Sequence, residues 1–316
     1  MAARARRFSS VPATAMVIAL AAAACGVLNW PGHFSYDSVV QLAEGRTGVY
    51  EGGHPPIMSW LLGVAAQIAP GAAPFVLLDM ALVFGSLLAF ALIPRRPSWR
   101  ASIAVAVLAF TPQFLIYPAI VWKDVLFAGA LCAGFASLAW AATGWASIWR
   151  RSLFLAGALI FLALAALARQ NGGLALLPAA AAVGWLALRA GARVWTAAAY
   201  GFGFLATAAA LVLTANALLA THLEDRSAVA EQFESLQLFD VVGAVARAPG
   251  LGLPVLRQAD PQLEQVIRTK GVALYSPVRV DSLEPILDNS EEADDSVGVL
   301  ARQSVFSMDS IAGDKG

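Results

Sequence analysis

Residues 194–219, VWTAAAYGFGFLATAAALVLTANALL, form the longest apolar run of the chain and decide its fold class. The run has no charged side chain, and it is longer than the roughly 20 residues that an α-helix needs to cross a bilayer. Six earlier apolar runs are of about spanning length. The sequence therefore predicts an all-α, polytopic membrane helix bundle with seven spans, at 12–30, 72–94, 101–118, 125–144, 152–168, 174–190 and 194–219.

The composition also indicates a membrane protein. Of 316 residues, 59% are hydrophobic and 13% are charged, whereas soluble domains are about 25% charged. We divide the chain into a basic N-terminus (1–11), a transmembrane domain (12–220) and a polar tail (221–316), because only five of the 21 acidic residues precede position 220. These five are Asp37, Glu44, Glu51, Asp79 and Asp124.

The distribution of basic residues predicts the orientation, because Lys and Arg concentrate in cytoplasmic loops. The apolar segment 55–69 is short for a span, and we interpret it as an interfacial helix. Ten of the thirteen basic residues before position 220 then lie on the cytoplasmic side. We interpret 12–30 as an uncleaved first span, since CGVLNWPGHF is a poor signal-peptidase site. The prediction is a multi-pass protein of the cell (inner or plasma) membrane with a cytoplasmic N-terminus.

This topology collects most of the remaining polar groups on the extracytoplasmic side, in the loops 31–71, 119–124 and 169–173 and in the tail. A functional site at the outer face is the natural inference. The candidate residues in these loops are Asp37, Gln41, His54, Lys123, Asp124, Arg169, Gln170 and Asn171.

The first outer loop contains two candidates. SYDSVVQLAEG (35–45) predicts a short amphipathic helix with Asp37 in its first turn, where the helix dipole favours an acid, and Gln41 on the same face. Taken alone, Asp37 is better explained as a helix-start residue in a solvated loop. In GGHPP (52–56), the prolines indicate a helix start. His54 either caps this helix or binds a phosphate or an acceptor hydroxyl.

The second outer loop, YPAIVWKDVLF (117–127), contains adjacent charges. Lys123 fits a snorkelling lysine beside an interfacial tryptophan. Asp124 is harder to explain in this way, because an acid at the edge of an apolar span is costly and usually functional. Asp79 lies inside the second predicted span and is expected to face the bundle interior.

The third outer loop, ARQNGG (168–173), follows the fifth span. Asn171 and the two glycines fit a helix C-cap. Arg169 is less well explained by capping, because it lies on the side where basic residues are depleted.

Motifs of soluble enzymes are absent from the sequence. It has no Walker loop, dinucleotide fingerprint, zinc-binding helix pair or nucleophile elbow. It also lacks the basic and aromatic patches that bind nucleic acid. Cys25 and Cys132 lie in apolar runs and are interpreted as small core residues.

The motifs DSVVQ (37–41), HPP (54–56), WKDVLFAGA (122–130) and RQNGG (169–173), in this order and on one side of the membrane, resemble the GT-C superfamily of membrane glycosyltransferases. The chain is most similar to bacterial relatives of the protein O-mannosyltransferases and the lipid A aminoarabinose transferase, in an uncharacterised bacterial branch. The resemblance covers residues 12 to about 220.

The resemblance implies a seven-span core and an enzyme of the cell envelope. Such an enzyme transfers a sugar, with inversion, from a polyprenyl-phosphate donor to a lipid, glycan or protein acceptor outside the membrane. Asp37 would be the catalytic base and Asp124 the second acid. Lys123, Arg169 and His54 would contact phosphate, although HPP stands where relatives have KPP. A divalent metal ion held by Asp37 and Asp124 stays an open alternative.

Two rival functions remain open at this stage. A transporter or flippase for lipid-linked glycans should carry polar groups near the bilayer midplane, where Asp79 is the only charged candidate. The second rival is that the protein is a non-catalytic or truncated paralogue, since relatives of this type usually continue into further spans. In the tail, 227–247 predicts an amphipathic helix and 261–270 a second, and the acidic, serine-rich end is expected to be disordered.

Overall fold

The computed structural model describes residues 11–50, 54–93, 99–222, 228–283 and 286. The chain divides into two compact units, residues 1–224 and 225–316. Each unit has a hydrophobic core of its own.

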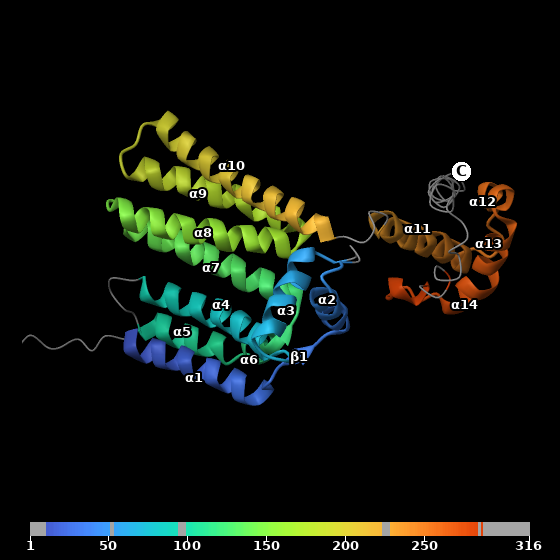
Figure 1. Cartoon of the computed structure of the whole chain (residues 1–316), viewed down its shortest axis with the longest axis horizontal. Helices are drawn as coiled ribbons and strands as arrows, with labels where there is room; N and C mark the ends of the chain where they lie inside the picture. Colours follow the sequence, from blue (N-terminus) through green and yellow to red (C-terminus); the bar gives the residue numbers. More distant parts are fainter. Residues whose placement is uncertain (1–10, 51–53, 94–98, 223–227, 284–285, 287–316) are drawn as a thin grey trace, which may run out of the picture. The chain divides into compact units, whose positions relative to one another are not determined.

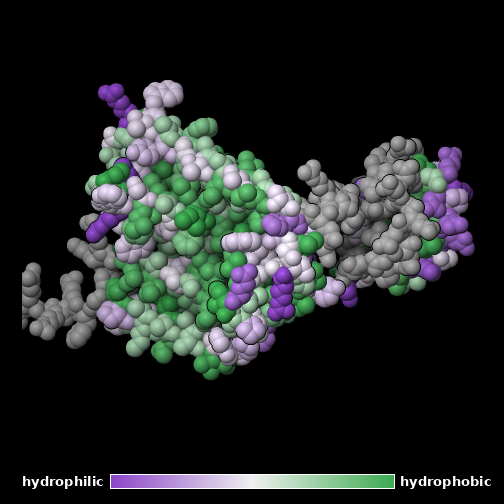
Figure 2. Space-filling view, in the orientation of Figure 1, coloured by the Kyte–Doolittle hydropathy of each residue, from purple (hydrophilic) through white to green (hydrophobic). Residues whose placement is uncertain are grey.

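Six helices of the described residues are long and apolar enough to cross a membrane, so the chain is a multi-pass membrane protein built as an all-α bundle (Figure 1). Apolar side chains cover much of the visible surface of the first unit (Figure 2), where bilayer lipid would surround it. The six helices are α1 (Val11–Asn29), α4 (Ala73–Leu92), α7 (Lys123–Thr143), α8 (Ile148–Ala168), a span over Asn171–Arg189 that contains α9 (Leu176–Arg189), and a span over Val194–His222 that contains α10 (Val194–Leu219). Two short 3-10 helices, η2 (Gln170–Ala175) and η3 (Ala220–His222), precede α9 and follow α10.

The segment predicted as a span at 101–118 is not one continuous helix. It consists of α5 (Trp99–Ala109) and α6 (Pro112–Ile116), which continues into the 3-10 turn η1 (Tyr117–Ala119), with a bend of 62° between the two halves. The cause is Pro112, because a proline ring disfavours the helical conformation of the preceding residue. Thr111 accordingly has extended backbone angles, φ −69° and ψ 151°. The described residues thus contain six continuous spans and one bent pair.

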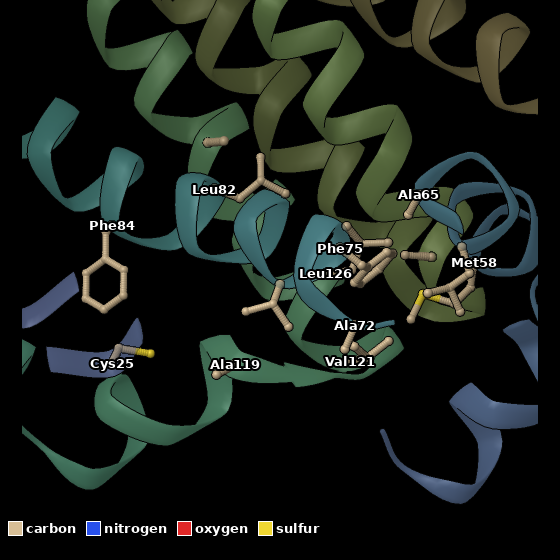
Figure 3. Close-up of a cluster of buried hydrophobic side chains, with 14 of the residues drawn as sticks. Cys25, Met58, Ala65, Ala72, Phe75, Leu82, Phe84, Ala119, Val121 and Leu126 are labelled. Atoms are coloured by element: carbon tan, nitrogen blue, oxygen red, sulfur yellow. The ribbon is translucent and has the colours of Figure 1, made fainter. Parts of the chain in front are cut away.

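Neighbouring helices of the bundle pack mostly as consecutive pairs. α7 lies against α8 and α9 against α10, while α4 packs against both α1 and α7. Large side chains from several of these elements meet around α4, among them Phe75, Met58 and Leu126, which are at most 1% exposed (Figure 3). Lipid tails are as apolar as these side chains, so close packing rather than water exclusion holds the helices together in a bilayer.

Two shorter helices, α2 (Tyr36–Thr47) and α3 (Pro56–Ile68), occupy the loop between α1 and α4. Both were expected from the sequence. They cross in backbone contact, because a Cβ atom on Gly45 would lie 2.1 Å from the carbonyl oxygen of Ser59 and 2.6 Å from the backbone nitrogen of Gly63. Beside this crossing, the Ser59 hydroxyl donates a hydrogen bond to the buried carboxylate of Glu44.

The second unit consists of one long helix and several short ones. The helix expected over 227–247 forms as α11 (Ala228–Arg247). The segment 261–270 forms α13 (Pro261–Val266) and the π-helical turn η4 (Ile267–Gly271). Residues 287–316, expected to be disordered, lie outside the described residues. The remaining elements are α12 (Pro254–Ala259), α14 (Val272–Leu274) and the 3-10 turn η5 (Val280–Leu283).

Candidate functional site

A short parallel β-ladder joins the loop after α1 to the start of α7. Strand β1 (His33–Phe34) pairs with β2 (Ile120–Val121), with His33 opposite Ile120. Each strand runs directly into a helix, β1 into α2 and β2 into α7. The ladder therefore sets the first turns of these two helices beside each other, although about 85 residues separate them in sequence.

The start of α2 is fixed by its own side chains. Ser35 is the N-cap, and its hydroxyl accepts a hydrogen bond from the Ser38 backbone N–H at 3.3 Å. The Ser38 hydroxyl accepts one from the Ser35 N–H at 2.7 Å. This capping box orients the first helical turn, which carries Asp37 as predicted.

Lys123 connects two of the predicted site residues. Its Nζ lies 3.7 Å from Oδ2 of Asp37 and 3.4 Å from Nδ1 of His54. The His54 nitrogen can accept a hydrogen bond from the ammonium group when it carries no proton. The side chains of Lys123 and Asp37 are 26% and 40% exposed, so this group is open to a ligand.

Asp124, the next residue of α7, forms an ion pair with Arg169. The carboxylate lies in the first turn of α7, where the helix dipole stabilises a negative charge. Since Lys123 and Asp124 are adjacent, both ion pairs meet at this turn. We call Asp37, His54, Lys123, Asp124 and Arg169 the charged cluster.

The turn that carries Arg169 differs from the predicted C-cap. Helix α8 ends at Ala168, and Arg169 itself is the cap residue with extended angles, φ −145° and ψ 134°. Asn171 and Gly172 belong instead to η2, which folds back on α8. The Gly172 N–H donates to the Arg169 carbonyl at 2.8 Å, and a Cβ on Gly172 would lie 2.5 Å from the Ala165 carbonyl oxygen. The interpretation of these residues as the C-cap of the helix is therefore wrong, because Arg169 is the cap residue. Close backbone contact requires the glycine.

Gln41, Asn171 and Asp79 form no hydrogen bond or ion pair with the charged cluster in the described structure. Gln41 is 1% exposed, and its Nε2 has no hydrogen-bond partner among the described residues. Asn171 is exposed. The side chain of Gln170 lies outside the described parts. Asp79 is fully buried in α4, as expected for an acid facing the bundle interior, and neither carboxylate oxygen has a partner in the described structure.

An apolar groove adjoins the charged cluster at His54. It has a volume of about 530 Å³ and lies between the start of α3, the end of α8, the start of α9 and the second half of α10. His54 and Asn216 are its most polar lining residues. Its apolar lining includes Pro55, Leu167, Leu176, Val212 and Leu213.

Tyr50, which the sequence did not single out, ties the loop before α3 to the end of α10. Its backbone N–H donates to the His222 carbonyl at 2.9 Å, and the two rings lie 5.6 Å apart. Burial, together with the nearby Glu44 carboxylate, raises the pKa of the Tyr50 phenol. Neither Tyr50 nor Glu44 stands in a recognisable motif. Their roles become visible only in the folded loop.

The arrangement places anion-binding cations beside two carboxylates. Among the described residues, no group of three His, Cys, Asp or Glu side chains could hold a metal ion. Asp37 and Asp124 are each paired with a cation in this structure. Comparisons with protein-family models, curated proteins and solved structures found no match to this chain.

Proposed function

We propose that this protein is a membrane glycosyltransferase that moves a sugar from a polyprenyl-phosphate donor to an acceptor hydroxyl, with inversion at the anomeric carbon. The observation that carries the proposal is the charged cluster. The Asp37 carboxylate lies 3.7 Å from the Lys123 ammonium group, which is also 3.4 Å from a ring nitrogen of His54. Asp124, the residue after Lys123 in the same turn of α7, is paired with Arg169. The sequence resemblance points to the same chemistry.

Phosphate binding is the first step that this cluster supports. A phosphate has the same charge sign as the carboxylates and would compete with them for Lys123 and Arg169. Arg169 offers two parallel donors and Lys123 a point charge. Binding of the donor phosphate would therefore release Asp37 from Lys123 at the moment when a base is needed.

Sugar transfer then requires one bond to form, one bond to break and one proton to move. The acceptor oxygen forms a bond to the anomeric carbon from the face opposite the phosphate. The bond between that carbon and the phosphate oxygen breaks, and polyprenyl phosphate leaves with both electrons. Asp37 takes the acceptor proton, late in the step because a carboxylate is a weak base at neutral pH. Lys123 and Arg169 stabilise the charge on the leaving phosphate.

The apolar groove beside His54 supports a lipid-linked rather than a soluble donor. Its walls at Leu167, Leu176 and Val212 would contact an isoprenoid chain, while the phosphate lies at the His54 end. A groove of about 530 Å³ holds only the first isoprene units, and the rest of the chain would remain in the bilayer.

Transport of a lipid-linked glycan is the second candidate, and Asp79 is the observation that favours it. An acid that is fully buried within a span and lacks a partner in the described structure is usually functional in membrane proteins. The charged cluster is better explained by transfer chemistry, because its ion pairs lie at helix ends and not within a span.

The decisive experiment measures sugar transfer from labelled undecaprenyl-phosphate sugars, with cell-envelope lipids and glycans as acceptors. Asp37→Asn should lower the rate by at least about 100-fold, the lower range for loss of a positioned acid–base group. Arg46→Gln, an exposed charge change on the same helix, should leave the rate within about twofold, a change worth well under 1 kcal/mol of barrier.

Two results would refute the assignment. Equal transfer by wild type and Asp37→Asn would remove Asp37 from the chemistry. Movement of the labelled lipid across vesicle membranes by both proteins, without any transfer, would identify a transporter. Lys123→Gln should weaken binding of the lipid-linked sugar whether the protein is a transferase or a transporter, so a binding measurement alone does not separate the two functions.

A further inference from the structure

The opposite end of the bundle contains a second groove, formed where α9 and α10 cross. Gly201 lies so close to α9 that a Cβ atom there would be 2.8 Å from the carbonyl oxygen of Ala180, and one on Gly184 would be 3.1 Å from that of Ala197. Small residues on both helices thus bring the backbones together. A groove of about 460 Å³ remains along the crossing, and its larger lining side chains are Trp185, Leu188, Val194, Phe202 and Leu205.

The polar rim of this groove is basic. The Arg189 guanidinium lies over the ring of Trp185, 5.0 Å from its centroid, and Trp185 lines the groove. Arg193 is the N-cap of α10 and directly precedes Val194, another lining residue. Both arginines are exposed, and neither forms an ion pair within the described residues.

The surrounding sequence contributes no negative charge. No Asp or Glu occurs between Asp124 and Glu224, a stretch that includes nearly all of α7 and the whole of α8, α9 and α10. The end of the bundle that holds Arg189 also holds Arg150 and Arg151 at the start of α8. An uncompensated basic surface at the end of a set of apolar helices attracts anionic lipid headgroups.

We infer that the groove between α9 and α10 binds one anionic phospholipid, with an acyl chain along the groove and the phosphate on Arg189 and Arg193. The acyl chain would contact the aromatic and aliphatic side chains that line the groove. Trp185 lies one turn before the end of α9, where tryptophans of membrane proteins commonly meet headgroups, and its ring lies beneath the Arg189 guanidinium.

A second copy of the chain fits this surface less well. In a symmetric dimer through the groove, the arginines of the two subunits would approach each other without a described acid between them. A neutral phospholipid could fill the groove equally well, but it would leave the two guanidinium groups without a net counter-charge. The charge of the rim therefore favours an anionic lipid.

Native mass spectrometry of the full-length protein in mild detergent tests this inference. Phosphatidylglycerol and phosphatidylcholine with identical acyl chains are titrated separately, and bound lipid is counted per protein. Tight binding of one phosphatidylglycerol is expected. Its affinity should fall about fivefold for each of Arg189→Gln and Arg193→Gln, the value of one interfacial basic residue.

Two control variants make the result specific. Arg100→Gln removes the same single charge from an exposed position on α5, away from the groove, and it should leave the preference for phosphatidylglycerol unchanged. Ala198→Phe fills the groove and should weaken both lipids alike, because Ala198 is an exposed lining residue.

Three outcomes would overturn the inference. Equal affinity for the two lipids would show that the rim charge does not select the occupant. An equal loss in the Arg100→Gln variant would assign binding to general surface charge. Dimers that persist without lipid and dissociate with Ala198→Phe would identify a second copy in the groove. The test needs no sugar transfer, so its result is independent of the proposed function.

Discussion

Lys123 and Asp124 are consecutive residues that take partners from different parts of the chain. Successive side chains of a helix point about 100° apart. Lys123 therefore contacts Asp37 and His54 from the loop between α1 and α4, while Asp124 contacts Arg169 at the end of α8. The first turn of α7 thus contacts both the loop between α1 and α4 and the end of α8. A charge change at Lys123 or at Asp124 should affect only the partners of that residue.

The ion pair between Asp124 and Arg169 should contribute little to stability. Their side chains are 28% and 46% exposed, so water screens the attraction. A double-mutant cycle of Asp124→Asn and Arg169→Gln should give a coupling free energy of about 0.2–1 kcal/mol. Unfolding by sodium dodecyl sulfate in mixed micelles measures it. A coupling above about 3 kcal/mol would instead indicate a dehydrated pair within the membrane.

The candidate residues could be predicted from the sequence only in part. Asp37, Lys123 and Arg169 stand out in the sequence because they are charged groups in the predicted outer loops, and the structure brings them to one turn of α7. Gln41 was placed on the face of Asp37 by helical spacing, but packing of α2 against α3 buries it. Tyr50 could not be selected, because its contact with His222 depends on how a loop meets the end of α10.

At the scale of elements, apolar length predicted helix positions well and helix continuity poorly. The span at 101–118 has the composition of a single helix, and only Pro112 marks the break. The β-ladder had no usable signal either, because two residues in each strand, His33–Phe34 and Ile120–Val121, are too few to show alternation. Yet this ladder determines which helix starts become neighbours.

The crossing of α2 and α3 predicts a clear effect of one methyl group. Gly63→Ala would place a Cβ 2.2 Å from the Gly45 carbonyl oxygen, so the helices must separate. The separation should also weaken the buried hydrogen bond from Ser59 to Glu44. We expect a loss of about 1–3 kcal/mol in the free energy of unfolding, as for other overpacked cores.

The matched control for this substitution is Gly203→Ala in α10. Apart from the neighbouring backbone of its own helix, nothing lies within 4 Å of the position that its Cβ would occupy, and alanine is the better helix former. Thermal unfolding in detergent should therefore be unchanged or slightly raised for this variant. If Gly63→Ala is equally harmless, the two helices do not cross in backbone contact.

At the scale of the whole molecule, the two units differ most in how they should respond to acid. Of the 21 acidic residues, only five precede position 220. In the described part of the second unit, Glu264 forms ion pairs with Arg257 and Arg268. Glu264 is 6% exposed and accepts hydrogen bonds from Arg257 at 2.7 and 2.8 Å and from Arg268 at 2.9 Å. Arg268 also donates to the carbonyls of Pro249 and Leu251, so this acid organises the turn before α12.

The hydrogen bonds that Arg257 and Arg268 donate to Glu264 lower the pKa of its carboxyl group from the ordinary value of 4.5 to about 2. A carboxyl whose pKa is lower in the folded state stabilises that state above the unfolded value. Its contribution should therefore be complete above about pH 5, and it should be lost as the pH falls from 4.5 towards 2. The second unit should open in this range.

Hydrogen exchange, corrected for the intrinsic rate at each pH, would follow residues 254–274, while tryptophan emission reports the first unit alone, because all nine tryptophans precede position 196. Protection in the second unit should fall between about pH 5 and pH 2, before any change in emission. Glu264→Gln should lower protection at pH 7 and remove most of this pH dependence, since the amide does not titrate. A wild-type protein that keeps full protection down to pH 2, or a variant with an unchanged acid transition, would show that the two arginines do not stabilise the fold through Glu264.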